Sequence, residues 1–342
     1  MAVLLCLLYI IWREKSSVSA PWEDRECGEL LQKQMDGMSR TMNKAPFCLP
    51  LLVCYNNGIH MERKHAMSTI REALRGAAAR LAAAGVPEAL NDAAQLLSRV
   101  TGEPPLNLRA DGSRALAADA EAAYEALVRR REQREPLQYI LGEAPFMGLM
   151  LKVAPQVLIP RFDTEELCQQ ALARMTGSER VLDLCTGTGA LAVAIGHHFP
   201  QARVYAGDIS PDAVALARQN AVRCGARVDV RQGDLFAPFA GESFDVIVSN
   251  PPYIPTGDLA GLQEEVKKEP ALALDGGPDG LALYRRIAAE APAHLAPGGW
   301  LLLEIGSDQA ADVSGLLAAN FEDISVYSDL NGLDRVVAGR KK

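Results

Sequence analysis

Short apolar runs alternate with longer amphipathic segments over the second half of the chain, and this alternation constrains the fold more than any other feature. The runs predict seven strands, at Arg180–Leu184, Arg203–Asp208, Val228–Gln232, Phe244–Ser249, Trp300–Ile305, Ile324–Ser328 and Arg335–Ala338. Strands that alternate with helices form a mostly parallel sheet that helices cover on both faces. We therefore predict an α/β domain with a seven-stranded, mostly parallel sheet over residues 164–342. Ligands of such sheets bind beyond the carboxyl ends of the strands, so functional residues are expected directly after strands.

The first 66 residues differ in character from the rest of the chain. They hold four of the seven cysteines, and their short apolar runs show no sustained helical period. The first run, MAVLLCLLYIIW, has 12 residues, which is too short for a helix that spans a bilayer. We expect residues 1–66 to be a poorly ordered extension, or an artefact of a start codon placed before Met67. A weak membrane anchor is the alternative.

Residues 67–142 have the spacing of a small helical bundle. Thr69 and Glu72 stand at the spacing of a capping box, in which the two residues satisfy backbone donors at a helix start. The apolar stripes of the first two predicted helices are Ile70, Leu74, Ala78 and Leu81, and then Leu90, Ala94 and Leu97. A third predicted helix ends in a basic turn near Gln133. After Gly142, strand-like residues broken by Gly and Pro predict a hairpin linker over residues 143–163.

Composition and charge argue against several classes of function. The formal net charge of −8 argues against a protein that binds nucleic acid mainly through its phosphates. The seven cysteines form no CxxC pair and no Cys/His cluster with zinc spacing, so we expect free thiols and no metal site. No targeting signal is evident, so a cytoplasmic protein with no membrane association is expected. His197, His198 and His294 are expected to be solvated surface residues.

The first predicted strand runs into a glycine turn, LDLCTGTGA. Gly187 and Gly189 allow a tight turn and a close approach of a ligand to the backbone. Asp183 stands at the tip of the strand, where its carboxylate can meet a cationic group of a ligand, directly or through water. The second strand ends at Asp208, 21 residues after Gly187, where a carboxylate can accept hydrogen bonds from two ribose hydroxyls. The turn and the acid together predict a ligand that contains a nucleoside.

Two kinds of nucleoside ligand fit this spacing. With Ala192 the turn matches the dinucleotide pattern G-x-G-x-x-G/A, so a nicotinamide dehydrogenase is one candidate. Asp183 would repel a pyrophosphate, however, and no acid for hydride transfer is evident. S-adenosylmethionine has ribose hydroxyls, no phosphate and a positive sulfonium, which suit a glycine turn flanked by carboxylates. After the third strand, Asp234 can accept from the adenine amine and Leu235 can line its ring, so we favour S-adenosylmethionine as the cofactor.

The fourth predicted strand ends in Asn-Pro-Pro-Tyr. The residue before a proline is held in the extended region, and neither proline has a backbone N–H. The side-chain oxygen of Asn250 and the carbonyl of Pro251 can therefore accept both hydrogens of a planar –NH2 group, on which Tyr253 can stack. Both hydrogen bonds strengthen as positive charge develops on the nitrogen during methyl transfer, so the stretch favours the transition state. It predicts methyl transfer to a planar amino nitrogen.

From Met67 to its end the chain resembles the protein-(glutamine-N5) methyltransferases that act on peptide-chain release factors. The resemblance is carried by LIPRFDTEEL (158–167), DLCTGTG (183–189), NPPY (250–253), EPALALDGGPDGL (269–281) and LLLEIG (301–306). Members of this family have a helical N-terminal domain, a hairpin and a seven-stranded class I methyltransferase (Rossmann-like) domain. Their substrate is the glutamine of a Gly-Gly-Gln loop. The resemblance implies that residues 67–142 recognise the release factor.

The same resemblance assigns site residues to this chain. The cofactor would contact Cys185, Thr186, Gly187, Thr188, Gly189, Asp208, Leu235 and Asn250, in addition to Asp183 and Asp234. The glutamine would lie against Asn250, Pro251, Pro252 and Tyr253, and Asn250, Pro251 and Tyr253 are the candidate catalytic residues. Cys185 stands where the family usually has a glycine, and Phe162 stands where it usually has a proline. A small residue still fits beside the cofactor, whereas Phe162 is expected to leave its loop less rigid.

Three other functions stay open. A related class methylates a glutamine of a ribosomal protein, although the run Asp163-Thr164-Glu165 favours the release-factor group. An adenine-N6 methyltransferase of DNA or RNA would use the same Asn-Pro-Pro-Tyr chemistry, but residues 67–135 are Ala-rich with few aromatics, unlike a target-recognition region. A non-enzymatic cofactor-binding module would have no use for this stretch. We expect a monomeric enzyme whose partner is a release factor, with no direct contact to nucleic acid.

Overall fold

The computed structural model describes residues 68–342. The predictions for residues 1–66 therefore lie outside the described residues. Between residues 68 and 342, no helix is long and apolar enough to cross a membrane. The expected cytoplasmic location stays a prediction.

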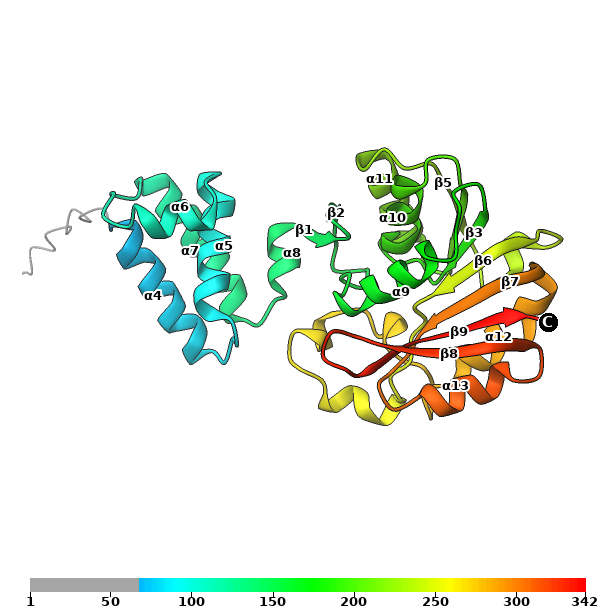
Figure 1. Cartoon of the computed structure of the whole chain (residues 1–342). Coiled ribbons are helices and arrows are strands. Elements are labelled where there is room, and N and C mark those ends of the chain that lie inside the picture. Colours follow the sequence, from blue (N-terminus) through cyan, green and yellow to red (C-terminus); the bar gives the residue numbers. More distant parts are fainter. Residues whose placement is uncertain (1–67) are drawn as a thin grey trace, which may run out of the picture. The chain divides into compact units, whose positions relative to one another are not determined.

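A seven-stranded sheet with the order β5-β4-β3-β6-β7-β9-β8 forms the C-terminal part of the described chain (Figure 1). Its strands are β3 (Arg180–Leu184), β4 (Arg203–Asp208), β5 (Val228–Gln232), β6 (Phe244–Ser249), β7 (Leu295–Glu304), β8 (Phe321–Ser328) and β9 (Asp334–Lys341). The strands β3 to β7 run parallel to their neighbours, and β9 lies antiparallel between β7 and β8. The predicted fold class is confirmed. The chain moves outward from β3 in one direction and from β6 in the other, so the switch point lies between these two strands.

The first four strands have the predicted bounds, whereas the last three are longer than predicted. Strand β7 begins at Leu295 instead of Trp300, β8 begins at Phe321 instead of Ile324, and β9 continues to Lys341. The added residues include polar and glycine positions that an apolar run does not reveal. Antiparallel pairing with the neighbouring strand extends the last two strands, as in the pair of Phe321 with Lys341.

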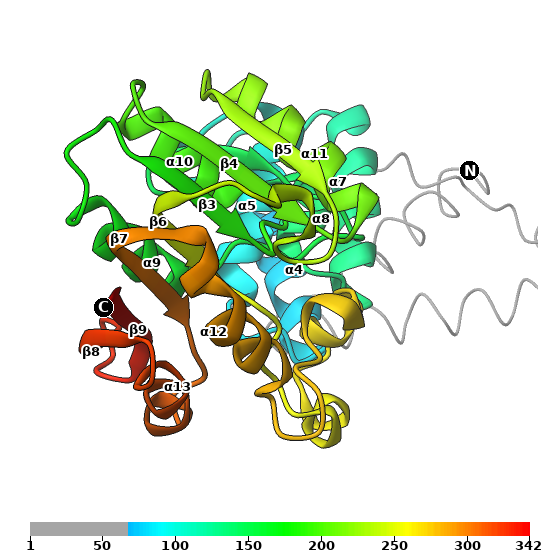
Figure 2. The same ribbon diagram turned by 90° about the vertical axis from the view of Figure 1, so that its right-hand side faces the viewer.

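Helices cover both faces of the sheet (Figure 2). The helices α9 (Asp163–Leu172), α10 (Ala190–His198) and α11 (Pro211–Arg223) pack on one face, and α12 (Ala282–His294) and α13 (Ala310–Leu317) pack on the other. Successive side chains of a strand point to opposite faces. In β3, Val181 therefore joins the core under the first group of helices, and Leu182 joins the core under the second. Because both faces are covered, β3 and β6 are buried at nearly every position and consist mostly of apolar residues, which is why the sequence revealed them.

The N-terminal part of the described chain is a bundle of α4 (Ile70–Ala83), α5 (Ala89–Thr101), α6 (Pro105–Ala110), α7 (Ala118–Glu132) and α8 (Leu137–Leu141). The predicted capping box of Thr69 and Glu72 is present at the start of α4. The assignment of Leu90 to the apolar stripe of α5 is wrong, because its side chain is 54% exposed while Ala94 and Leu97 are fully buried. The short helices α6 and α8 were not predicted. Each has a proline at or just before its first residue, a position where the missing N–H costs nothing.

A two-stranded hairpin follows the bundle, with strands β1 (Glu143–Phe146) and β2 (Leu149–Lys152). Its turn residues Met147 and Gly148 both have a positive φ, of 47° and 75°. Asn220 of α11 accepts a hydrogen bond from the backbone N–H of Lys152 and donates one to its carbonyl. The hairpin is thus joined to the sheet domain through a fully buried side chain. The exact division of the chain at residues 142 and 163 stays a prediction.

Arginines of the bundle also bind the segment between β6 and α12. Arg131 of α7 is buried and pairs with Asp92 of α5 at 2.8 Å and with Glu265 at 2.8 Å. Arg134 makes a second pair with Glu265 at 2.5 Å. Glu265 belongs to the same chain segment that begins at Asn250, so the bundle fixes one point of the segment that follows the Asn-Pro-Pro-Tyr stretch.

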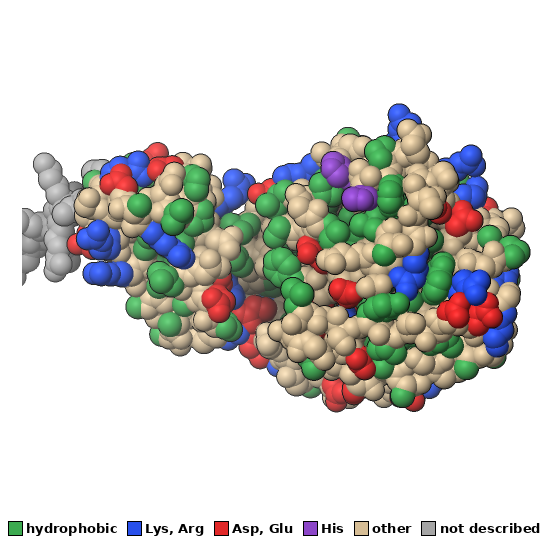
Figure 3. Space-filling view, in the orientation of Figure 1, with side chains coloured by type: hydrophobic (Ala, Val, Ile, Leu, Met, Phe, Trp, Pro, Cys, Tyr) green, Lys and Arg blue, Asp and Glu red, His purple; other side chains and the backbone are tan. Residues whose placement is uncertain are grey.

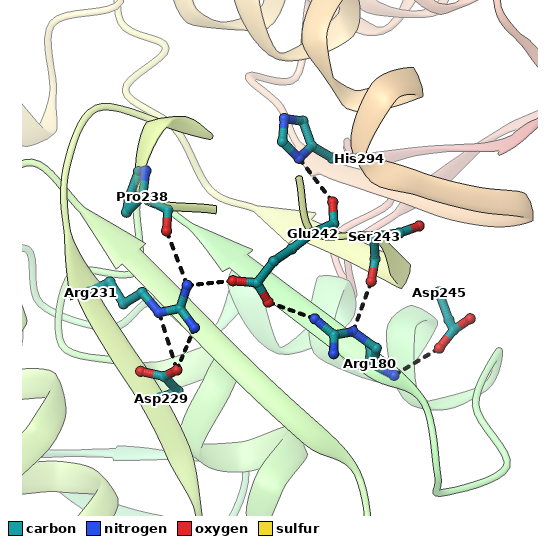
Figure 4. Close-up of polar contacts among 8 residues, drawn as sticks. All are labelled: Arg180, Asp229, Arg231, Pro238, Glu242, Ser243, Asp245 and His294. Carbon is teal, nitrogen blue, oxygen red and sulfur yellow. Dashed lines mark hydrogen bonds and ion pairs between the residues drawn. The ribbon is translucent and has the colours of Figure 1, made fainter. Parts of the chain in front are cut away.

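A polar cluster ties strands β3 and β5 to the turn before β6 (Figure 4). Glu242 pairs with Arg180 at 2.6 Å and with Arg231 at 2.5 Å. The guanidinium groups of both arginines lie over the ring of Tyr205, 4.9 and 5.4 Å from its centroid. His294 donates a hydrogen bond from Nδ1 to the carbonyl of Glu242 in this turn, and its ring stacks on Phe236. The prediction of a solvated His294 is therefore wrong, whereas His197 and His198 are exposed as predicted.

The face of the molecule drawn in Figure 3 carries acidic and basic side chains in mixed groups. The structure contains exposed pairs between the two kinds of charge, for example Arg340 with Glu322 at 2.9 Å and Arg285 with Asp279 at 2.5 Å. On this face the basic side chains do not form one continuous stripe of the kind that follows a nucleic-acid backbone.

Candidate active site

A cavity of about 220 Å³ lies beyond the carboxyl ends of β3, β4 and β6, at the switch point of the sheet. The predicted site residues that line it are Asp183, Cys185, Thr186, Gly187, Thr188, Asp208, Asp234, Leu235, Asn250 and Pro252. Three other predicted residues, Gly189, Pro251 and Tyr253, lie beside these residues in the chain without lining the cavity. Residues more than 60 positions apart thus meet because parallel strands end at the same edge of the sheet.

The turn after β3 needs a left-handed backbone at three alternate positions. Cys185, Gly187 and Gly189 have φ values of 56°, 56° and 82°. At Gly189 there is a second requirement, because a Cβ atom would lie 3.0 Å from the Cβ of Ala217 and 3.1 Å from its Cα. Gly189 therefore lets α10 begin in close contact with α11, and its role in the structure is packing at the edge of the site.

Cys185 stands at a position whose backbone conformation favours the expected glycine. A φ of 56° is in the left-handed region, which glycine adopts freely and most other residues adopt at a cost. The size of the Cys185 side chain could be judged from the sequence, whereas this conformational requirement could not. The thiol faces the cavity, and burial raises its pKa to about 12, so it is uncharged at neutral pH.

Asp183 is fully buried, and it is not freely available at a strand tip. One of its carboxylate oxygens, Oδ2, accepts a hydrogen bond from the hydroxyl of Thr186 at 2.5 Å and one from the N–H of Ala192 at 3.2 Å. The other oxygen, Oδ1, is buried and has no hydrogen-bond partner. Burial raises the pKa of Asp183 to about 7. The residue therefore holds the glycine turn with one oxygen and leaves one acceptor beside the cavity.

Asp208 at the end of β4 holds the turn from the other side. Its Oδ2 accepts the N–H of Gly187 at 2.9 Å, and its Oδ1 accepts the N–H of Ser210 at 2.9 Å. A carboxylate oxygen can accept more than one hydrogen bond, so both oxygens keep capacity for a ligand. Burial raises the pKa of this carboxyl group, and the two backbone donors oppose that rise.

Asp234 and Leu235 follow β5 on the opposite wall of the cavity. Asp234 pairs with Arg286 of α12 at 2.8 Å, and both side chains are about half exposed. This pairing was not expected from the sequence, and it leaves one Asp234 oxygen, Oδ1, for other donors. Leu235 is buried and has a positive φ of 45°, a conformation that turns the backbone sharply after Asp234.

Asn250 follows β6 and lines the cavity. Its Nδ2 donates to the hydroxyl oxygen of Thr164 at 3.2 Å, so the amide oxygen is the group left for a ligand. The strand behind it is held by Ser249, whose hydroxyl donates to the carbonyl of Leu184 in β3 at 2.8 Å. This bond joins the ends of the two strands that flank the switch point.

Tyr253 is partly buried against the core below α12, and burial raises its pKa to about 12. Its carbonyl accepts a hydrogen bond from the side-chain amide of Gln309 at 3.0 Å. Gly280 packs directly against the same carbonyl, where a Cβ atom would come within 2.3 Å of the oxygen. These contacts fix the backbone of the Asn-Pro-Pro-Tyr stretch, and stacking of the Tyr253 ring on a substrate stays a prediction.

Two buried carboxylates next to the site were missed as functional candidates. Glu269 accepts the N–H of Ile159 at 3.1 Å and pairs with Arg161, so it joins two segments that line the cavity. Glu304 ends β7 and is 1% exposed, and one of its oxygens, Oε2, has no hydrogen-bond partner. An acidic residue that closes an apolar strand, as in LLLEIG, is the sequence signal that could have revealed Glu304.

This chain is similar to several known proteins. Residues 72–142 match the family model described as the PrmC N-terminal domain, and residues 156–267 match that of the methyltransferase small domain. A release factor glutamine methyltransferase of Geobacter sulfurreducens is 47% identical over 282 residues, which are 82% of this chain and 99% of that protein. One of Moorella thermoacetica is 45% identical over 273 residues, 78% of this chain and 96% of that protein. A methyltransferase structure from Pyrococcus furiosus covers 57% of this chain and 89% of its own, with 20% identity and a TM-score of 0.45.

Proposed function

Because this chain belongs to the family of release factor glutamine methyltransferases, we propose that it transfers a methyl group from S-adenosylmethionine to the side-chain amide nitrogen of a glutamine in peptide-chain release factors. The target is the glutamine of the Gly-Gly-Gln loop that the sequence resemblance implies. The observation that carries the proposal is the amide of Asn250, which donates to Thr164 and so leaves its oxygen as the acceptor at the cavity.

The cavity suits S-adenosylmethionine because carboxylates and apolar groups line it. Asp183 has a buried oxygen without a partner, which fits a cationic group of the cofactor, directly or through water. Asp208 would accept from the ribose hydroxyls, and Leu235 would contact the adenine ring. A pyrophosphate would meet the same carboxylates and be repelled, which argues against a dinucleotide. S-adenosylmethionine supplies an electrophilic methyl group on a positive sulfonium.

The Asn-Pro-Pro-Tyr stretch would hold the glutamine. The Asn250 amide oxygen and the Pro251 carbonyl would accept the two N–H groups of the substrate amide, and Tyr253 would lie against its planar face. The lone pair of an amide nitrogen is delocalised, so this nitrogen is a poor nucleophile until its geometry is fixed. As positive charge develops on the nitrogen, both accepted hydrogen bonds become stronger, and the barrier falls.

Methyl transfer from radiolabelled S-adenosylmethionine tests the proposal, with purified release factor, intact ribosomes and naked DNA as parallel substrates. We expect labelling of the release factor only, and its loss when the target Gln is replaced by Glu, because Glu removes both N–H donors and adds a charge. Labelling of the Gln→Glu factor, or of DNA at the rate of the factor, would refute it. Labelling of ribosomes alone would instead support methylation of a ribosomal protein.

We further propose that the chain acts as a monomer and contacts the release factor through its helical bundle, without direct contact to nucleic acid. The absence of nucleic-acid contact is supported by the net charge of −8 and by the mixed charges on the face in Figure 3. A salt titration tests the last point. Activity should fall only gently with salt, whereas binding to duplex DNA falls by about 0.9 in log affinity per phosphate contact for each tenfold rise in salt.

A further inference from the structure

Arg286 is a basic side chain in the wall of the cavity, and it binds an acidic side chain of the same cavity. Its Nη2 donates a hydrogen bond to Oδ2 of Asp234 at 2.8 Å. Asp234 follows β5 whereas Arg286 lies in α12, so the pair joins two segments that are 52 positions apart. The two side chains are 45% and 51% exposed, and an ion pair with this exposure contributes little to stability. Its position at the cavity points instead to a role in ligand binding.

Helix α12 directs two residues at the cavity while other residues of the helix pack on the sheet. Leu283 and Arg286 line the cavity, and residues three positions apart are neighbours on the surface of a helix. Tyr284 and Ile287 are fully buried in the core between α12 and the sheet. Tyr284 also donates from its hydroxyl to the carbonyl of Glu304 at 2.7 Å. Arg286 therefore extends from a helix that is fixed against the sheet.

The segment that carries Asp234 contacts α12 at a second point. Phe236 stacks on His294 at the end of α12, with ring centroids 4.6 Å apart and an angle of 12° between the rings. Leu235 lies between these two contacts in the chain, is buried and lines the cavity. The same helix thus holds the residues on both sides of Leu235.

The ion pair leaves one oxygen of Asp234 available to a ligand. Oδ2 binds Arg286, and Oδ1 accepts no hydrogen bond from the residues that the structure describes. A carboxylate accepts hydrogen bonds and donates none. Oδ1 therefore matches the 6-amino group of adenine, which donates, and opposes the 6-oxo group of hypoxanthine, which accepts. Without the guanidinium group the carboxylate would be free to rotate away from the cavity.

We propose that Arg286 is a positioning residue that holds the carboxylate of Asp234 so that the cavity selects a 6-aminopurine nucleoside. This inference rests on the proposed function, because it gives Asp234 the adenine amine of the cofactor as its partner. A carboxylate that is already held does not have to be ordered when the ligand binds. Ordering one side chain lowers affinity by roughly 2- to 12-fold, so this is the contribution expected of Arg286.

Calorimetric binding of two ligands to the full chain tests the proposal. The ligands are S-adenosylhomocysteine and S-inosylhomocysteine, which has a 6-oxo group in place of the 6-amino group. The unmodified protein should bind the adenosyl compound at least about tenfold more tightly, the factor expected for one hydrogen bond to a charged group. Arg286→Met keeps an unbranched side chain but removes the guanidinium. It should weaken binding of the adenosyl compound roughly 2- to 12-fold and reduce the preference between the two ligands.

Arg285→Met is the matched control. Arg285 is the neighbouring residue of α12, its side chain is 49% exposed and it pairs with Asp279, but it does not line the cavity. The control therefore loses an ion pair of the same kind and should keep both affinities. Equal losses of affinity in Arg285→Met and Arg286→Met would show an effect on the helix as a whole and would overturn the proposal.

A double variant shows whether Arg286 acts through Asp234. Asp234→Ala should remove most of the preference for the adenosyl compound, and adding Arg286→Met should cause no further loss. An equal further loss in the double variant would mean that the guanidinium contacts the ligand itself, which would refute the positioning role. An Arg286→Met protein with unchanged affinity and preference would refute it too.

The same measurements separate this inference from the proposed function. If the unmodified protein binds neither S-adenosylmethionine nor S-adenosylhomocysteine, the proposed function fails. If it binds them and Arg286→Met matches it for both ligands, only the role of Arg286 fails.

Discussion

Asp208 offers the sharpest test of cofactor binding, because its carboxylate serves both the protein and the proposed ligand. It already accepts the backbone N–H groups of Gly187 and Ser210, each at 2.9 Å. Hydrogen bonds to a charged acceptor contribute about 1.5–3 kcal/mol each. Loss of one such ribose contact in Asp208→Ala should therefore weaken S-adenosylmethionine binding by roughly 10- to 150-fold, since 1.4 kcal/mol is a factor of ten, and loss of a second contact would weaken it further.

The same substitution should lower stability, because two backbone donors lose their acceptor. An unsatisfied buried donor costs about 1–3 kcal/mol, and water that enters the vacated space offsets part of this loss. Asp208→Asn is the matched control, since it keeps the shape and one acceptor oxygen but turns the other into a donor. We expect Asn to fall between Asp and Ala in cofactor affinity. Burial raises the pKa of Asp208, so the affinity of the unmodified protein should also fall as acid protonates this group.

Isothermal calorimetry gives the affinities, and a single-turnover methylation assay at saturating cofactor gives the rate of the chemical step. The affinity should fall far more than the rate, because Asp208 holds the ribose and does not contact the reacting nitrogen. An Asp208→Ala protein that binds the cofactor within about threefold of the unmodified chain would remove Asp208 from the proposed site. A variant whose rate falls as much as its affinity would show that the glycine turn has moved, and thermal melting would reveal that change.

Three further predictions concern the Asn-Pro-Pro-Tyr stretch, the glycine turn after β3 and the polar cluster around Glu242. Asn250→Ala should lower turnover by about 10²–10³ with only a modest loss of cofactor affinity, and near-normal single-turnover rates would contradict its role. Cys185→Val places a β-branched side chain at a φ of 56°, so calorimetry and melting should show weaker cofactor binding and lower stability, whereas Cys185→Gly should bind normally. Glu242→Gln should lower the free energy of unfolding by about 1–2 kcal/mol at pH 7 without changing activity, because it weakens the pairs with Arg231 and Arg180. Arg231 holds the pKa of Glu242 below its ordinary value, so the difference between the two proteins in denaturant unfolding should shrink as pH falls below about 4.5, and a constant difference would refute this.

The central sheet could be predicted because burial on both faces leaves short clusters of apolar residues in its central strands, as in the VIV of β6. Strands such as β3 and β6 therefore show their ends in the sequence, and the residues that follow them could be placed at one edge of the sheet. The residue types also predicted the reaction, since Asn250 before two prolines provides acceptors for both hydrogens of a planar –NH2 group. These are local signals, and they need no knowledge of the packing.

The features that escaped prediction depend on contacts between distant segments. Leu90 lies on an apolar stripe by spacing, but its side of α5 is exposed in the folded bundle. His294 stacks on Phe236, which is 58 positions away, and no local pattern encodes that contact. The pair of Asp234 with Arg286 spans 52 positions. For Cys185 the missing information was a backbone angle, which size and polarity do not report.

The clamp of Asp183 and Asp208 on the glycine turn links the folding of the protein to its affinity for the cofactor. The two carboxylates hold the turn of residues 185–189 and the start of α10 by accepting hydrogen bonds from Thr186, Gly187 and Ala192. Ordering the backbone of a flexible residue costs about 1–2 kcal/mol, so a mobile five-residue turn would subtract several kcal/mol from the binding free energy. In this protein the turn is already ordered on folding, so cofactor binding does not bear that entropy cost. In a variant that lacks one of these hydrogen bonds, the turn should become ordered only when the cofactor binds. The melting temperature of such a variant should therefore rise with cofactor concentration.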